Sequence, residues 1–136
     1  MDDLVAESVQ EGFRFVSRLR EEWVSGVNRF AGKGEALFAG FDADQLVAVG
    51  GINRQSADCG RLRRVYVRKA DRRRGLGGQL VRHIMNFAAQ HYRRVVLRTD
   101  TEAAEHFYVA LGFIRQAGDG GSTHAFEIGR QSLKSL

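Results

Sequence analysis

A loop rich in arginine and glycine lies near the middle of this chain, between the strand-like run Val65-Tyr66-Val67 and an amphipathic stretch. Where a glycine loop runs into a helix, the first amide N–H groups have no partner inside the helix. The helix dipole adds partial positive charge at the same place. We therefore expect an anion to bind there. The residues concerned are Arg72, Arg73, Arg74, Gly75, Leu76, Gly77 and Gly78.

The positive charge of the chain is concentrated around this loop. Residues 54–74 hold nine lysines and arginines against two aspartates, whereas the whole chain of 136 residues carries a net charge of +5. A protein that binds nucleic acid along a broad face usually spreads its basic residues over an extended patch or stripe. The local concentration favours a small anionic group over a nucleic acid.

The spacing of the glycines separates this loop from two common phosphate-binding motifs. A Walker loop needs Lys and Ser or Thr after its last glycine, but Gln79 follows Gly78 here. The spacing G-x-G-G also departs from the dinucleotide fingerprint. The pattern that fits is R-x-x-G-x-G, with Arg72, Gly75 and Gly77 in its fixed places. It resembles the acyl-coenzyme-A loop of the GNAT superfamily of N-acetyltransferases.

A second segment strengthens the resemblance. Family members carry a short helix of the form N-x-x-A-x-x-F/L-Y-x-x-x-G-F after the loop, a helix and a strand. Residues 101–113 of this chain read Thr-Glu-Ala-Ala-Glu-His-Phe-Tyr-Val-Ala-Leu-Gly-Phe, with Ala104, Tyr108 and Gly112 in register and Thr101 in place of the Asn. The segment 21–35 is also similar to one branch of the family. The likeness therefore covers nearly the whole chain.

Length and composition predict one domain, residues 1–136, with a proper hydrophobic core. No apolar run approaches the roughly 18 residues of a membrane span. The acidic start Met1-Asp2-Asp3 does not look like a secretory signal, so we expect a cytoplasmic protein without a membrane partner. Cys59 stands alone, which excludes an internal disulfide and a multi-cysteine metal site, and we expect no metal.

The first half of the chain alternates between helical and strand-like patterns. Apolar residues at spacings of three and four predict a helix over residues 9–30. Residues 36–41 and 46–52 predict a hairpin, 53–60 a loop, and 61–68 a third strand. In that strand the apolar positions are Leu62, Val65 and Val67, so strict alternation is broken. A β-bulge produces such a slip.

The second half predicts a helix, a short parallel strand and a final hairpin. A helix with one buried face begins at Leu76 and runs through residue 88, and residues 94–99 form a strand reached by this crossover. Asp100 or Thr101 caps the next helix, and Gly112 ends it. Strands over 113–117 and 123–128 flank a turn at 118–121, and residues 131–136 form a tail.

The resemblance implies an α+β fold and a specific place for the donor. The expected fold is a mixed, largely antiparallel sheet with helices on both faces, in which the bulge splays the third strand from its parallel neighbour. The opening exposes backbone at Val65, Tyr66 and Val67 to the pantetheine arm of acetyl-CoA. The implied cofactor-binding set also contains the loop residues 72–78 and Thr101, whose hydroxyl replaces part of the function of the missing amide.

The same resemblance implies acetyl transfer to an amine of a small molecule or protein. We expect direct transfer in a ternary complex, with an N–H near Val67 polarising the thioester and Tyr108 as the acid that protonates the departing thiolate. Many members carry a glutamate at the start of the bulged strand, where this chain has Arg61. The general base stays open between four side chains, a water chain, and no base at all for a substrate amine of low pKa. These side chains are Glu22, Glu35, His106 and His124.

One alternative from another class of function remains at this stage. The chain could be a non-catalytic module that senses acyl-CoA, or a basic protein that binds nucleic acid through residues 61–74. The sequence does not identify the acceptor, and it leaves the oligomeric state, including a homodimer, open.

Overall fold

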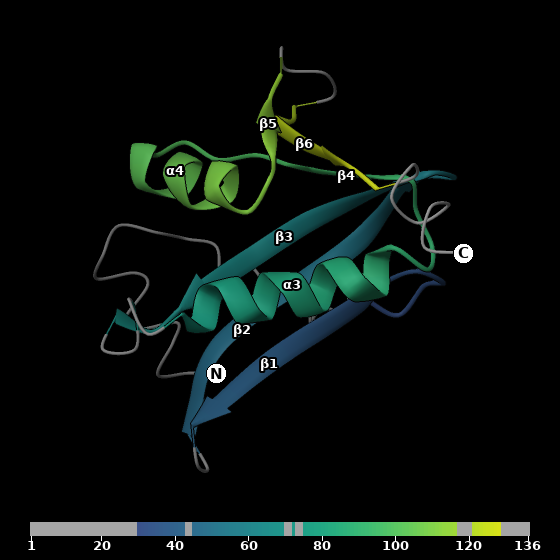
Figure 1. The fold of residues 1–136 in the computed structure, drawn as a ribbon. Coiled ribbons are helices and arrows are strands. Elements are labelled where there is room, and N and C mark those ends of the chain that lie inside the picture. The colour runs from purple at the N-terminus through teal and green to yellow at the C-terminus, as the bar shows by residue number, and fades with distance from the viewer. Residues whose placement is uncertain (1–29, 43–44, 70–71, 73–74, 117–120, 129–136) are drawn as a thin grey trace.

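The computed structural model describes residues 30–42, 45–69, 72, 75–116 and 121–128. They form a six-stranded sheet with the strand order β1-β2-β3-β4-β6-β5, in which β3 and β4 make the one parallel pair among the described strands. This confirms the predicted mixed, largely antiparallel sheet (Figure 1). The strands are β1 (Ala36–Asp42), β2 (Gln45–Ser56), β3 (Cys59–Val67), β4 (Arg94–Leu97), β5 (Ile114–Arg115) and β6 (His124–Glu127), and the helices are α3 (Leu76–Ala88) and α4 (Glu102–Ala110).

The first hairpin, β1 with β2, is confirmed, but the predicted loop at residues 53–60 is wrong. Strand β2 continues to Ser56, and β3 already begins at Cys59, so only a tight turn separates them. Asn53 pairs across the ladder with Arg61. The polar side chains of this segment suggested a loop, yet they belong to strands at the end of the sheet, where several side chains meet solvent.

The predicted bulge in the third strand is present. Gly51 lies opposite Arg63 and Val49 lies opposite Tyr66, so β3 has one residue more than β2 between these two pairs. Arg64 takes up the extra length with a left-handed backbone, φ 59°. A bulge bends its strand and increases the local twist. Strand β3 is thus bent immediately before Val65–Val67.

Beyond the bulge, β3 and β4 separate. Their parallel pairing joins Cys59–Arg61 to Arg94–Val96 and does not extend further along β3 among the described residues. From there to Val67, β3 pairs with β2 alone. Figure 1 shows β3 running away from β4 toward the start of α3. The sheet is therefore forked, and we call the space between these two strands past Arg61 the gap.

Helix α3 packs on one face of the sheet through its buried residues Leu80, Val81, Ile84 and Ala88. On the opposite face, Phe30, Val49 and Tyr66 form a smaller cluster. Nearly all of the helix predicted at 9–30, which would lie on a second face, falls outside the described residues. No helix in the described ranges is long and apolar enough to cross a membrane.

The C-terminal elements follow the prediction with shorter strands. Thr101 caps α4, and Gly112 follows the helix with φ 105°, where a side chain would also meet Phe126. Strands β4, β5 and β6 are shorter than the predicted 94–99, 113–117 and 123–128. The tail at 131–136 and most of the turn at 118–121 lie outside the described residues.

Candidate active site

The start of α3 leaves amide groups without a helical partner. Gly75 is the N-cap with φ 78°, and no side chain caps the helix there. The first helical bond runs from the Gln79 N–H to the Gly75 carbonyl oxygen at 3.1 Å, so the N–H groups of residues 76–78 precede the helical bonding pattern. The first turn contains no acidic residue. An anion fits here because both the free amides and the helix dipole would stabilise it.

Two glycines of the loop meet different needs. A side chain at Gly75 would contact nothing within 4 Å, so this position opens toward solvent. A Cβ at Gly77 would lie 3.3 Å from both the Phe107 ring and the Val67 side chain. Gly77 therefore lets the start of α3 approach β3 and α4 closely, and this contact places both helices on the same face of the sheet.

Arg72 ties the loop to the end of β3. Its Nε atom donates to the Val67 carbonyl oxygen at 2.9 Å, and its guanidinium lies 5.2 Å from the centre of the Tyr66 ring. The Tyr66 side chain is buried on the face opposite α3. Tyr66 pairs with Val49, and the alternation of the ladder turns its backbone N–H and C=O groups toward β2 and away from the gap, so the backbone contact that the sequence assigned to Tyr66 is not available. Arg73 and Arg74, which the sequence assigned to the donor, lie outside the described residues.

The backbone of Val67 faces the gap. The Arg68 N–H donates to the Val47 carbonyl oxygen at 2.7 Å, so the next pair, Val67 opposite Ala48, is of the non-hydrogen-bonded kind. The N–H of Val67, and by alternation that of Val65, therefore point away from β2 and toward the gap. Because Arg72 already uses the Val67 carbonyl, the Val67 N–H is the group left for a ligand.

Thr101 lies at the start of α4 with its oxygen already engaged. Its Oγ1 accepts a hydrogen bond from the Ala104 N–H at 3.1 Å. A hydroxyl can accept and donate at once, so the Thr101 proton stays available for a ligand carbonyl. The pantetheine contact that the sequence assigned to Thr101 stays a prediction.

Tyr108 sits among aromatic rings on α4. Its ring makes edge contacts with Phe107 at 4.9 Å and Phe113 at 5.6 Å between centroids. Burial raises the pKa of the Tyr108 phenol well above its usual value. Within the described residues, no protein group bonds the hydroxyl. The phenol therefore keeps its proton at any working pH and has that proton to offer.

Three of the proposed general bases are placed by the structure, and two of them are poorly suited. Burial of Glu35 works against its charge, but hydrogen bonds from the Arg54 and Gly32 N–H groups hold its pKa below the usual value. A carboxylate of low pKa is a weak base. His124 is fully buried, so a substrate amine cannot reach its ring. His106 is exposed on α4, and Glu22 lies outside the described residues.

The remaining side chains that the sequence singled out near β3 take part in polar contacts. Arg61 donates to Gln55 Oε1 at 3.0 Å and to the Gly121 carbonyl oxygen at 3.3 Å. Cys59 is partly buried, and burial raises the pKa of its thiol, which makes it a poor nucleophile. The described residues contain no cluster of side chains that would hold a metal.

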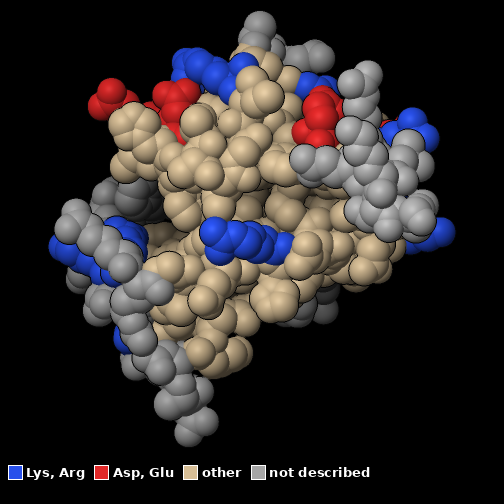
Figure 2. Space-filling model, viewed as in Figure 1, with Lys and Arg blue, Asp and Glu red and all other residues tan. Residues whose placement is uncertain are grey.

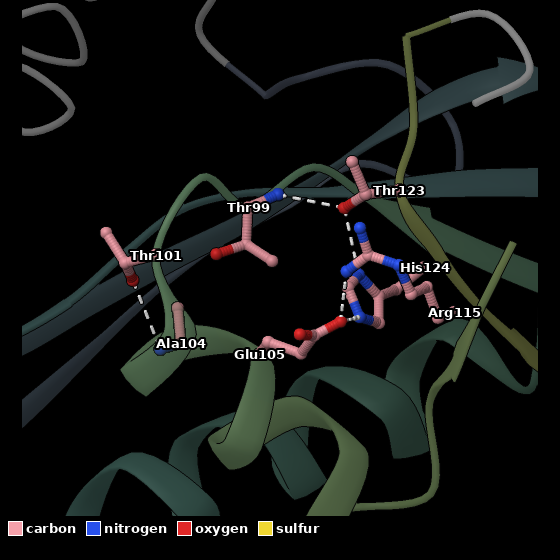
Figure 3. Close-up of polar contacts among 7 residues, drawn as sticks. All are labelled: Thr99, Thr101, Ala104, Glu105, Arg115, Thr123 and His124. Carbon is pink, nitrogen blue, oxygen red and sulfur yellow. Dashed lines mark hydrogen bonds and ion pairs between the residues drawn. The ribbon is translucent and has the colours of Figure 1, made fainter. Parts of the chain in front are cut away.

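Sequence reasoning missed one polar cluster beside α4. His124 Nε2 lies 3.0 Å from Glu105 Oε2, and its Nδ1 lies 2.8 Å from Thr123 Oγ1. The Thr99 N–H donates to the same Thr123 oxygen at 3.0 Å, and Arg115 pairs with Glu105 (Figure 3). Glu105 and His124 are far apart in sequence, so no spacing pattern could have joined them.

The loop, the forked sheet and the α4 motif together define an acyl-CoA-dependent acetyltransferase of the GNAT class. The family model described as "Acetyltransferase (GNAT) domain" matches residues 33–115. The chain therefore belongs to the GNAT acetyltransferase family, whose members use acetyl-CoA. A search of curated proteins finds no match.

Solved structures agree with this family. A protein assigned as an acetyltransferase from Exiguobacterium sp. 255-15 is 34% identical with a TM-score of 0.82, over 97% of this chain and 86% of that chain. A GNAT-family acetyltransferase from Staphylococcus aureus Mu50 shares the fold at 15% identity and a TM-score of 0.75, over 92% of this chain and 87% of that one. Rv2747 from Mycobacterium tuberculosis, solved in complex with CoA, matches at 23% identity and a TM-score of 0.55, over 60% of this chain and 50% of its own.

Proposed function

We propose that this protein is an N-acetyltransferase that moves an acetyl group from acetyl-CoA to an amine by direct transfer in a ternary complex. The observation that carries the proposal is the fork of the sheet beside the start of α3. The gap offers backbone N–H groups at Val65 and Val67, and the helix start offers further amides with a basic loop in front. A linear donor with a diphosphate at one end and an acyl group at the other fits this arrangement.

The loop and the helix start would hold the diphosphate. Acetyl-CoA supplies a thioester whose carbonyl is open to attack by an amine. The amides of Leu76, Gly77 and Gly78 would donate to phosphate oxygens, and Arg72 would keep the loop against β3. Since α3 begins near the open end of the gap, the acyl end of the donor would point toward the fork, along Val67 and Val65.

The Val67 N–H would polarise the thioester carbonyl. It points into the gap, and a fixed donor aimed at a developing negative charge is worth about 3 kcal/mol in similar sites. The protein would need no covalent link to the acetyl group, because holding both substrates in contact already lowers the barrier. The acetyl group would pass directly from the thioester sulfur to the amine nitrogen, with the carbon–nitrogen bond formed and the carbon–sulfur bond broken.

Tyr108 would protonate the departing sulfur. Its raised pKa makes it a weak acid in isolation, so the phenol would donate a hydrogen bond first and release its proton as charge builds on the sulfur. The amine would lose its own proton to solvent through a chain of waters. The low-pKa state of Glu35 and the burial of His124 support this choice over those two side chains.

Two observations weigh against the nucleic-acid-binding alternative. On the face shown in Figure 2, Lys and Arg side chains stand in separate groups with uncharged surface between them and do not form a stripe. Among the residues of helix α3, Arg82 is the single lysine or arginine. A nucleic-acid site would need a more continuous basic surface.

A thiol-release assay tests the proposal. Purified protein is mixed with acetyl-CoA and an amine library, and free thiol is measured together with the mass of each amine. We expect thiol to appear in step with an amine that gains one acetyl group. CoA binding without thiol release from any amine would favour the sensor. Nucleic-acid binding that falls steeply with salt and does not change when acetyl-CoA is added would favour the nucleic-acid-binding alternative.

A further inference from the structure

Helix α4 packs against the core through a few apolar side chains. None of its nine residues is buried, and its inward side chains, Phe107 and Tyr108, are only partly covered. These apolar contacts hold the helix on the sheet, but apolar burial is non-directional and does not by itself fix a small rotation or slide of the helix. Polar contacts of defined geometry can fix that remaining freedom.

Glu105 makes the polar contacts that join α4 to the sheet. Its Oε2 atom accepts from His124 Nε2, on the first residue of β6, and pairs with Arg115 on β5. Figure 3 shows the Glu105 side chain reaching from the helix to both residues. The three groups therefore connect α4 to two neighbouring strands.

The hydrogen bonds of His124 fix how its ring is held. The Glu105 carboxylate can only accept, so Nε2 must carry a proton. In the neutral ring, Nδ1 then accepts from the Thr123 hydroxyl, whose oxygen accepts in turn from the Thr99 N–H just after β4. Both ring nitrogens of a fully buried side chain are thus bonded. The ring orientation is therefore fixed, and the ring can hold the Glu105 carboxylate in place.

The turn of α4 that contains Glu105 also carries Tyr108, the proposed acid. Glu105 and Tyr108 are three residues apart and so lie on neighbouring positions of one helix face. The Glu105 N–H donates to the Thr101 carbonyl oxygen at 3.0 Å, which places the cap in the same unit. We propose that Glu105 and His124 are positioning residues, which hold α4 so that the Tyr108 hydroxyl meets the sulfur of the donor. This inference rests on the function proposed above.

Two substitutions at His124 separate its two bonds. His124→Gln keeps an N–H near the Nε2 position and hence the bond to Glu105. His124→Asn keeps a polar group near the Nδ1 position, which can still bond Thr123, but loses the bond to Glu105. We expect His124→Asn to lower kcat about tenfold or more, because small misplacements of a reacting group have such effects. His124→Gln should keep most of the activity, and the dissociation constant for CoA should stay the same in both. Glu102→Gln, an exposed change on the same helix, is the matched control.

A double-mutant cycle with Tyr108→Phe gives the decisive result. If the pair acts through the phenol, His124→Asn should change kcat by less than about twofold in the Tyr108→Phe protein, whereas independent effects would multiply. Multiplied losses, or equal losses from His124→Gln and His124→Asn, would overturn the inference. If His124→Asn does not fold, Glu105→Gln, at a partly exposed side chain, takes its place in the cycle with the same two outcomes. Failure of the proposed function would appear separately, as a wild-type protein that releases no thiol with any amine.

Discussion

The Nε atom of Arg72 donates to the carbonyl oxygen of Val67, so the loop before α3 is tied to the last residue of β3. This bond uses the Val67 carbonyl oxygen, so the Val67 N–H is the backbone group of this residue that is left to face a ligand in the gap. The same guanidinium stacks over Tyr66 on the far side of the strand. Arg72 thus connects the part of the site proposed to bind the diphosphate to the part proposed to bind the acyl arm.

Arg72→Lys should weaken donor binding while the charge is kept. Lysine cannot reproduce both the Nε bond and the flat contact with Tyr66. We expect the dissociation constant for CoA to rise about tenfold, the usual scale for a hydrogen bond from a charged group. Calorimetry with CoA measures it, and Arg93→Lys, at an exposed position between α3 and β4, is the control. An unchanged dissociation constant would remove Arg72 from the donor site.

Gly78→Asp should move stability and donor affinity in opposite directions. A carboxylate in the first turn of α3 favours the helix dipole, and replacing glycine favours the helix, together by about 1 kcal/mol. The same negative charge would repel the diphosphate. We expect a higher unfolding midpoint and much weaker CoA binding, measured by thermal unfolding and calorimetry. Gly78→Asn is the control without charge, and equal affinities for the two variants would contradict an anion site here.

The stability contributed by Glu105 should disappear in acid. The hydrogen bond from Arg115, with a further one from His124, holds the pKa of Glu105 below its ordinary value of 4.5. A carboxyl whose pKa is lowered by folding stabilises the protein above that ordinary value and loses the effect as pH falls below it. Wild type and Glu105→Gln should therefore differ most near neutral pH and converge below pH 4.5. Denaturant unfolding across this range measures the difference in unfolding free energy between the two proteins. A difference that grows in acid would contradict the contact.

Tyr108→Phe should lower turnover by about 10²- to 10⁴-fold, the range for a positioned acid, with CoA affinity unchanged. The change removes only the hydroxyl, so the aromatic contacts with Phe107 and Phe113 survive. Steady-state kinetics and calorimetry measure the two quantities. Tyr92→Phe, which loses a buried bond to the Gly34 carbonyl oxygen away from the gap, is the control for a lost phenol. Equal turnover in wild type and Tyr108→Phe would exclude the acid role.

The strand and helix order of the described chain could be predicted because local patterns determine it. The broken alternation around Val65 indicated the bulge, and Arg64 shows why, since its left-handed backbone absorbs the extra residue. The polar run from Asn53 to Ser56 misled the prediction, because a strand at an exposed sheet end does not need apolar side chains.

The candidate site could be predicted only where a motif is continuous in sequence. Arg72, Gly75 and Gly77 follow one another along the loop, so their spacing was informative. The pairing of Glu105 with His124 depends on how α4 lies on β6, which no local pattern records. Burial likewise sets His124 apart from the other base candidates, and nothing around His124 in the sequence shows that its ring is enclosed.

The crystal structure of this protein with bound acetyl-CoA tests the central proposal most directly. We expect the diphosphate within hydrogen-bond distance of the amides of residues 76–78 and the acyl arm between β3 and β4, with its carbonyl near the Val67 N–H. A donor bound elsewhere, or a gap closed by continued pairing of β3 with β4 beyond Arg61, would contradict it.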